Sequence, residues 1–245
     1  MRDVCGKLAL SSLRFVAAAL IFVSPAFSAN YDWKLPRGFP EPAVPADNPM
    51  SEAKVELGRR LFFEPRLSVT GKFSCASCHA PERAFSESRS VAVGATGKTL
   101  PLNAMALVNV AYNVSYGWNK PSVRSLEAQM LEPLLNDHPV EMGLKGREDK
   151  VLAELAKDVS YRRKFASAFP DDQDTAAITF DNLVKAIASF ERTLISGSSA
   201  FDRYLFAGDH AALSDEAKRG MDLFFSPQAG CANCQRSCRT AGLQA

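Results

Sequence analysis

The pentapeptide Cys75-Ala76-Ser77-Cys78-His79 is the most informative segment of this chain. Two thiols three positions apart can add to the two vinyl groups of one haem, while the adjacent imidazole ligates its iron. A zinc half-site and a thioredoxin-like redox pair are the alternatives. Both are disfavoured, because the chain has only three histidines and no strand-helix alternation surrounds the motif. The motif therefore predicts covalent c-type haem, with Cys75 and Cys78 as anchors and His79 as iron ligand.

The segment that precedes this motif recurs near the end of the chain. Gly58-Arg59-Arg60-Leu61-Phe62-Phe63 lies before the first cysteine pair, and Gly220-Met221-Asp222-Leu223-Phe224-Phe225 lies before Cys231-Ala232-Asn233-Cys234. On a helical wheel each copy places Gly, Leu and Phe on one arc, which predicts an amphipathic helix whose glycine lets another backbone approach closely. Two copies of a helix followed by CxxC predict two related haem modules, the second anchored by Cys231 and Cys234.

The second copy lacks the histidine of the first. Gln235 stands at the position of His79, and a carboxamide is a poor iron ligand. Residues 207–245 are also about the size at which a domain needs metals or other staples to fold. We therefore expect a truncated second cytochrome c-like domain over residues 207–245. A frameshift near the Cys234 codon is the hypothesis, and sequencing the genomic locus would test it.

Composition excludes some classes of function. The formal net charge is +2 and 47% of the residues are hydrophobic, which is ordinary for a globular protein. The basic residues are scattered, so no electrostatic footprint for a phosphate backbone exists and we expect no nucleic-acid partner.

The N-terminus has the pattern of an export signal. Arg2 and Lys7 precede an apolar block over residues 15–23, and the small residues Ala26 and Ser28 follow. The pattern predicts a signal peptide over residues 1–28 and no membrane span after its cleavage. A buried core helix is the alternative.

The rest of the chain predicts helices joined by long loops. Prolines make residues 29–50 an extended arm. Caps and apolar spacing predict helices at about 51–63, 125–135, 147–157 and 179–194, with a loop-rich stretch over residues 64–120. No strand alternation is found, so the expected class is all-α, two cytochrome c-like haem domains with loop-rich insertions. The first would occupy residues 51–206.

Several segments, in this order, resemble the bacterial di-haem cytochrome c peroxidases and the related MauG-type enzymes. The resemblance covers nearly all of residues 35–235. The segments that carry it are Leu35-Pro36-Arg37-Gly38-Phe39-Pro40, Asp47-Asn48-Pro49, Leu57-Gly58-Arg59-Arg60-Leu61-Phe62, Ser74-Cys75-Ala76-Ser77-Cys78-His79, Trp118, Leu126-Glu127-Ala128-Gln129, Pro139-Val140-Glu141-Met142-Gly143 and Ala188-Ser189-Phe190-Glu191-Arg192-Thr193-Leu194.

The resemblance implies a periplasmic enzyme that reduces hydrogen peroxide at one haem, while a second haem passes in electrons from a small donor such as cytochrome c. In MauG-type relatives the same apparatus oxidises a protein substrate. A homodimer is compatible with the family.

The resemblance also assigns roles to individual residues. His79 would be the proximal ligand of the peroxide-reacting haem, and Glu141 the distal acid-base residue, since a carboxylate can move a proton between the peroxide oxygens. The remaining assignments are Gln129 and Pro133 in the distal pocket, Trp118 between the two haems, and Asn103 as a ligand of a calcium ion. Without the resemblance, Glu141 would be a solvated acid, Trp118 a core aromatic and Gln129 an exposed helix residue.

Two departures from the family bear on activity. Many members carry a further histidine beyond the CxxCH that blocks the peroxide site, whereas residues 91–97 contain none. The first haem should then be five-coordinate or water-ligated, with a high-spin ferric spectrum. The second departure is Gln235, which removes the expected route of electron entry.

The leading function is peroxide reduction with electrons from a cytochrome c-like donor. The alternatives are a mono-haem electron carrier or an inactive remnant, and MauG-type oxidation of a protein substrate. An open distal site with Glu141 favours the enzyme, because a carrier normally saturates its iron with two protein ligands.

Overall fold

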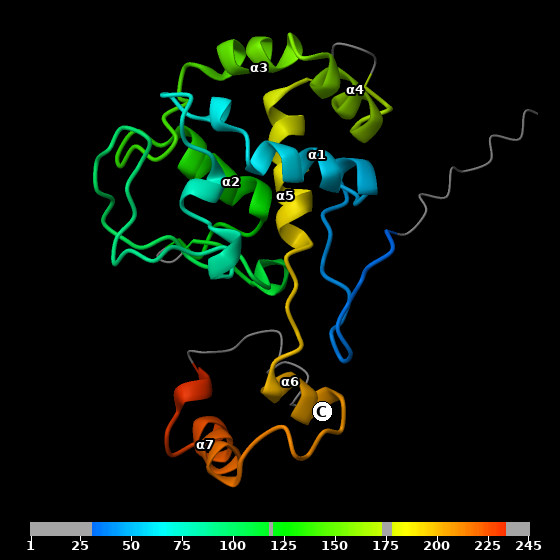
Figure 1. Ribbon diagram of the computed structural model, residues 1–245, viewed down its shortest axis with the longest axis vertical. Coiled ribbons are helices and arrows are strands. Elements are labelled where there is room, and N and C mark those ends of the chain that lie inside the picture. The colour runs from blue at the N-terminus through cyan, green and yellow to red at the C-terminus, as the bar shows by residue number, and fades with distance from the viewer. Residues whose placement is uncertain (1–30, 118–119, 173–177, 234–245) are drawn as a thin grey trace, which may run out of the picture. The chain divides into compact units, whose positions relative to one another are not determined.

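The computed structural model describes residues 31–117, 120–172 and 178–233. The predicted signal peptide (1–28), Trp118, Cys234 and Gln235 lie outside these residues. The described part of the chain contains α-helices, short 3₁₀ turns and three isolated β-bridges, and it forms no strand (Figure 1). The predicted all-α class is therefore confirmed.

Three of the predicted helices begin where they were expected, each after a residue whose side chain caps the helix. Helix α1 (Glu52–Phe62) starts after Ser51, whose side chain accepts a hydrogen bond from the Lys54 amide. Helix α2 (Leu126–Leu135) follows Ser125, and helix α5 (Phe180–Arg192) follows Thr179; both caps accept bonds from backbone amides in the same way. Helix α3 (Glu148–Ala156) also lies where expected.

Two helices were not expected from the sequence, α4 (Val159–Ala168) and α6 (Ala200–Phe206). Helix α4 carries three consecutive polar or basic residues that mask its apolar face, yet Tyr161 and Phe165 are fully buried. Helix α6 is too short for a period to be recognised. Helix α7 (Asp215–Phe225) contains the second copy of the repeat.

Helices α1 and α5 cross each other (Figure 1), and Gly58 of the first copy of the repeat lies against α5. A Cβ atom built on Gly58 would lie 1.9 Å from the Ala186 carbonyl oxygen. This confirms the prediction that the glycine admits another backbone. The same prediction is wrong for Gly220 in α7, where the described residues place nothing within 4 Å of such an atom.

Within the described residues, an apolar cluster joins helices α1 to α5. Helices α1 and α5 supply its centre, α2 and α4 flank it, and the segment after Glu141 closes it. Its fully buried members are Leu57, Leu61, Phe62, Leu67, Leu134, Leu144, Leu155, Tyr161, Phe165, Leu183, Ala186, Ile187 and Ala188.

A buried hydrogen-bond network around Asn48 joins the end of the proline-rich arm to two helices. Asn48 is fully buried, and its amide donates to the Glu127 carboxylate of α2 at 2.7 Å and to the Lys185 carbonyl of α5 at 3.0 Å. Arg192 of α5 contacts both oxygens of Glu127 at 2.6 Å. The arm therefore ends in a fixed contact with α2, the helix that carries Gln129.

Among the residues that the structure describes, no helix is both long enough and apolar enough to cross a bilayer.

Candidate haem site

The CxxCH motif begins with a 3₁₀ turn, η2 (Cys75–Ser77), which Cys78 caps, and His79 follows Cys78. His79 Nδ1 lies 3.0 Å from the Phe85 carbonyl oxygen. Because a carbonyl only accepts hydrogen bonds, this contact places the proton of a neutral ring on Nδ1, and that tautomer carries its lone pair on Nε2. Burial lowers the pKa of His79, although hydrogen bonds to the Phe85 and Met105 carbonyls and the charge of Glu87 oppose this, and the lowered pKa favours the neutral imidazole that binds a metal.

A strained turn supplies that carbonyl. Ala84 and Phe85 have φ values of 56° and 53°, in the left-handed region that residues with a Cβ rarely adopt. The chain therefore doubles back, and an isolated bridge pairs Ala80 with Ser86. The turn orients the imidazole through Phe85, which packs against Phe62 and Phe190 of the core.

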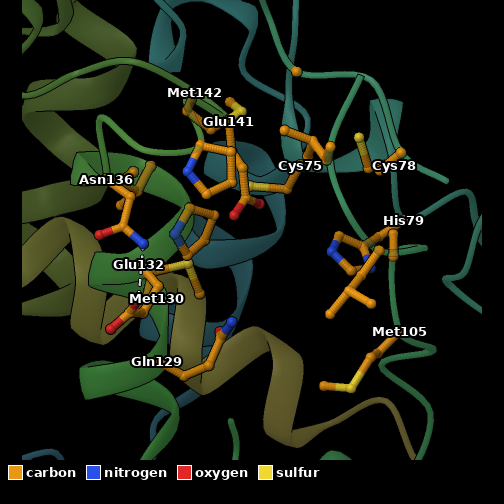
Figure 2. Close-up of a pocket in the computed structure, with 18 of the residues that line it drawn as sticks. Cys75, Cys78, His79, Met105, Gln129, Met130, Glu132, Asn136, Glu141 and Met142 are labelled. Atoms are coloured by element: carbon orange, nitrogen blue, oxygen red, sulfur yellow. Dashed lines mark hydrogen bonds between the residues drawn. The ribbon is translucent and has the colours of Figure 1, made fainter. Parts of the chain in front are cut away.

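The two thiols and the imidazole line a cavity of about 460 Å³. Burial raises the pKa of Cys75 to about 12, and burial also raises that of Cys78, so both are neutral thiols at pH 7. Figure 2 shows His79 and Met105 on one side of this space and Gln129, Glu132 and Glu141 on the other.

Helix α2 forms part of the opposite wall. Gln129 and Pro133 lie four residues apart, on one face of the helix, and both line the cavity. Proline in a helix interior removes a backbone donor and so leaves the carbonyl of Gln129 without its usual partner. The structure thus brings both predicted distal residues to the cavity that His79 faces.

Glu141 lies on the loop after α2 and is fixed by backbone hydrogen bonds on both sides. Its own carbonyl accepts from the Ala95 amide at 2.7 Å. The next residue, Met142, donates to the Pro133 carbonyl at 2.9 Å and accepts from the Val69 amide at 2.8 Å. Gly94 permits this approach, since a Cβ there would lie 2.2 Å from the carbonyl oxygen of Val140.

Two carboxyl groups of this wall have pKa values displaced in opposite directions. Burial raises the pKa of Glu141, and the nearby Glu132 carboxylate adds to the shift. Glu132 is hydrogen-bonded by Lys120 at 2.6 Å and by Asn136 at 2.7 Å, and these bonds lower its pKa. Such a divergence is typical of an acid-base residue beside a fixed charge.

These residues fit a covalently bound haem. Cys75 and Cys78 offer two thiols and His79 an imidazole whose Nδ1-protonated tautomer carries a lone pair on Nε2, and the cavity before them is lined mostly by apolar side chains. Val93, Gly94 and Ala95 also line it, so the segment over residues 91–97 contributes no histidine to the wall.

The other predicted site residues are less informative. Asn103 is exposed at the edge of the cavity, and its amide donates to the carbonyl of Arg89. Within the described ranges no group of three or more His, Cys, Asp or Glu residues could hold a metal ion, so the calcium ion stays a prediction. Cys231 is an exposed thiol in the turn η6 (Cys231–Asn233). Trp118 and Cys234 lie outside the described residues.

Three cavity residues were missed by the sequence analysis as functional candidates. Tyr116 and Glu191 line the cavity, and so does His138, whose side chain is 94% exposed and which therefore belongs to the rim. Glu191 was quoted only as part of a motif. No local pattern distinguishes a buried acid from a surface acid, so only the tertiary structure identifies it.

The chain matches a known protein family and several known proteins. The family described as di-haem cytochrome c peroxidase matches residues 52–211. The methylamine utilization protein MauG of Methylorubrum extorquens is 35% identical over 207 residues, which are 84% of this chain and 55% of that protein. The cytochrome c peroxidase Ccp of Escherichia coli K12 is 35% identical over 198 residues, which are 81% of this chain and 40% of that protein.

A solved structure is similar as well. The crystal structure of a MauG-like protein associated with microbial copper homeostasis superposes with a TM-score of 0.78 at 41% identity, covering 84% of this chain and 58% of that one. The chain thus spans between 40% and 58% of the length of these three relatives.

Proposed function

Because the chain belongs to the di-haem cytochrome c peroxidase family, we propose that it is an oxidoreductase that reduces hydrogen peroxide in the cavity between His79 and Glu141. Cys75 and Cys78 would hold haem c through thioether bonds, and His79 Nε2 would ligate its iron. The haem would supply the iron at which the oxygen–oxygen bond is cleaved. The family match supports this proposal, and the geometry of the cavity supplies its chemical detail.

The position of Glu141 carries the proposal. Its carboxyl lines the same cavity as His79 and comes from the opposite wall (Figure 2). Cleavage of peroxide requires a proton to leave the inner oxygen and to reach the outer one, which departs as water. A carboxyl whose pKa is raised by burial is a better proton acceptor than an exposed one, so it can take up that proton and return it. The Gln129 amide can orient the peroxide by hydrogen bonding, and Pro133 narrows the space beside it.

Reduction of one peroxide to two waters consumes two electrons and two protons. We propose that the electrons come from a small c-type cytochrome and that the protein works in the periplasm after removal of residues 1–28. A second haem at Cys231 and Cys234, a calcium ion at Asn103, an electron relay at Trp118 and a homodimer belong to the same proposal. Residues 51–206 would form the peroxidase domain and residues 207–245 part of the second domain.

Oxidation of a protein substrate is the second candidate. One observation favours it: Val93, Gly94 and Ala95 line the cavity in the segment where many family members carry a blocking histidine. A site open without prior reduction can react with peroxide while both oxidising equivalents stay available for a side chain of another protein.

The test is peroxide consumption by protein made in a host with c-type haem maturation machinery. Intact mass and the pyridine haemochrome first give the number of haems per chain. With one reduced cytochrome c as donor, the Glu141→Gln variant should lose about 10²–10⁴-fold in turnover while it keeps its haem. Glu154→Gln is the matched control, because Glu154 is an exposed carboxylate that does not line the cavity. Equal turnover in wild type and Glu141→Gln would contradict the proposed role.

A mono-haem electron carrier would behave differently. It would load one haem, exchange electrons with cytochrome c and consume no peroxide in either variant.

A further inference from the structure

A second acid faces the cavity from helix α5. Glu191 is 4% exposed, lines the cavity, and has one carboxyl oxygen, Oε2, without a hydrogen-bond partner within the described part of the chain. A buried polar atom without a partner costs about 1–3 kcal/mol, more if charged, so such an atom is unusual in a settled core.

The neighbouring arginine does not neutralise Glu191. Arg192 is 2% exposed and directs Nη2 to both carboxylate oxygens of Glu127, while its Nη1 has no partner among the described residues. Arg192 is therefore hydrogen-bonded to Glu127 and not to Glu191. This arrangement leaves Glu191 beside a compensated cation and near a second carboxylate.

Among residues 31–117, 120–172 and 178–233, no other charged group near α5 is hydrogen-bonded to Glu191. The titratable groups on the elements packed against α5 are Glu52, Lys54, Glu56, Arg59 and Arg60 on α1, Glu127 and Glu132 on α2, Tyr112 on η4 (Val110–Tyr112), and Glu148, Asp149, Lys150 and Glu154 on α3. The titratable groups that line the cavity together with Glu191 form a second set, Cys75, Cys78, His79, Tyr116, Lys120, Glu132, His138 and Glu141. Lys54, the buried cation on α1, donates hydrogen bonds to the Asn48 side chain and to the Pro49 carbonyl.

An unpaired carboxyl at this depth favours its protonated form unless a positive charge lies near it. Burial raises the pKa of Glu191 to about 8; Arg192 opposes this shift and Glu127 adds to it. A ferric haem carries one more positive charge than a ferrous one, and charges in a buried site act strongly on each other. The proton affinity of a carboxyl on the cavity wall must therefore rise when the haem is reduced.

We propose that Glu191 is the redox-linked proton site of this cavity, a carboxyl that takes up a proton from solvent when the haem accepts an electron. The step is balanced as ferric haem with the Glu191 carboxylate, one electron and one proton, giving ferrous haem with the Glu191 carboxylic acid. The electron comes from a c-type cytochrome in the proposed reaction and from dithionite in the test. Glu191 thus holds, next to the reaction space, a proton of the kind that peroxide reduction consumes. The inference rests on the proposed haem site, and it holds whether or not the protein turns over peroxide.

The test is the midpoint potential of the haem as a function of pH, measured by spectroelectrochemistry on the full haem-loaded chain. In wild type the potential should fall with rising pH, with a slope approaching 59 mV per unit, the value for one proton per electron. The slope should be lost in Glu191→Gln, which has the same shape and cannot exchange a proton. Asp181→Asn is the control, because Asp181 is an exposed acid on the same helix.

Infrared difference spectroscopy assigns the group. Reduction of wild type should add the carbonyl band of a protonated carboxyl, and the band should be absent from Glu191→Gln. Glu191→Gln with an unchanged slope and band would overturn the proposal. If that variant does not load haem, wild type still decides: no proton uptake on reduction between pH 6 and 9, measured with a pH indicator, would equally overturn it. Loss of peroxide turnover with a normal slope would contradict the proposed function alone.

Discussion

The substitution Gly58→Ala tests whether the backbone contact between α1 and α5 holds the haem domain together. The added methyl carbon would lie 1.9 Å from the Ala186 carbonyl oxygen and 2.5 Å from the carbonyl carbon. This is about 1.5 Å short of the roughly 3.5 Å at which nonbonded atoms meet. Both obstructing atoms belong to the backbone of α5, so no side chain can rotate away, and the two helices must separate.

The expected cost follows from two opposing effects. Overpacking a buried contact costs about 1–3 kcal/mol, and a rigid backbone obstacle places this site at the upper end. Alanine gains about 1 kcal/mol over glycine in a helix interior. The net loss should be about 2 kcal/mol, which lowers the melting temperature by roughly 4–8 °C for a chain of this size.

The repeat provides a matched control. Gly220 occupies the same position in α7, and nothing among the described residues lies within 4 Å of a Cβ there. Gly220→Ala should therefore keep or raise stability by up to about 1 kcal/mol. The free energy of unfolding, from urea denaturation of the haem-loaded protein, compares the two variants with wild type. Equal stabilities of Gly58→Ala and Gly220→Ala would refute the close-approach argument.

Three further results are expected. Asn48→Ala should destabilise the protein by about 1–3 kcal/mol in the same urea assay, because it leaves buried partners such as Glu127 unsatisfied. A loss below roughly 0.5 kcal/mol, the size typical of a surface substitution, would contradict a stabilising role of the hydrogen-bond network around Asn48. Burial opposes ionisation of Glu64, but hydrogen bonds outweigh it and lower its pKa to about 2. This folded-state pKa lies below the unfolded value of 4.5, so the contribution of Glu64 to the free energy of unfolding is fully present above about pH 5. That contribution, on the order of 3 kcal/mol, is lost as the pH falls towards 2. Glu64→Gln should flatten this pH dependence. Gly94→Ala should displace the loop that holds Glu141, so turnover should fall at least tenfold while haem content, read from the haemochrome, is unchanged.

Local sequence patterns predicted most of the helices and one wall of the site. Ser51, Ser125 and Thr179 are caps whose chemistry is local, so the start of each helix could be read directly. Helix α4 could not, because its exposed face is unusually basic and its burial depends on Arg60 and Arg66, which stack on Tyr161 from other segments.

Among the residues that line the cavity, some could also be predicted from local sequence and others could not. Cys75, Cys78 and His79 follow from spacing alone, whereas Gln129, Pro133 and Glu141 were expected only through the family resemblance. Their meeting depends on backbone bonds between distant loops, which no periodicity encodes. Glu191 is the extreme case, since its significance lies in the absence of a bonded partner among the residues described, and that is a property of the tertiary structure.

The ferric absorption and electron paramagnetic resonance spectra of the haem-loaded wild type test the central claim most directly. The claim is that His79 binds the iron from one side and that the side of Gln129 and Glu141 is open to peroxide. The account predicts a high-spin signal from the haem at Cys75 and Cys78, present before any reduction. A purely low-spin spectrum would mean that a protein ligand, with His138 at the rim as the first candidate, closes the site, and it would contradict the account.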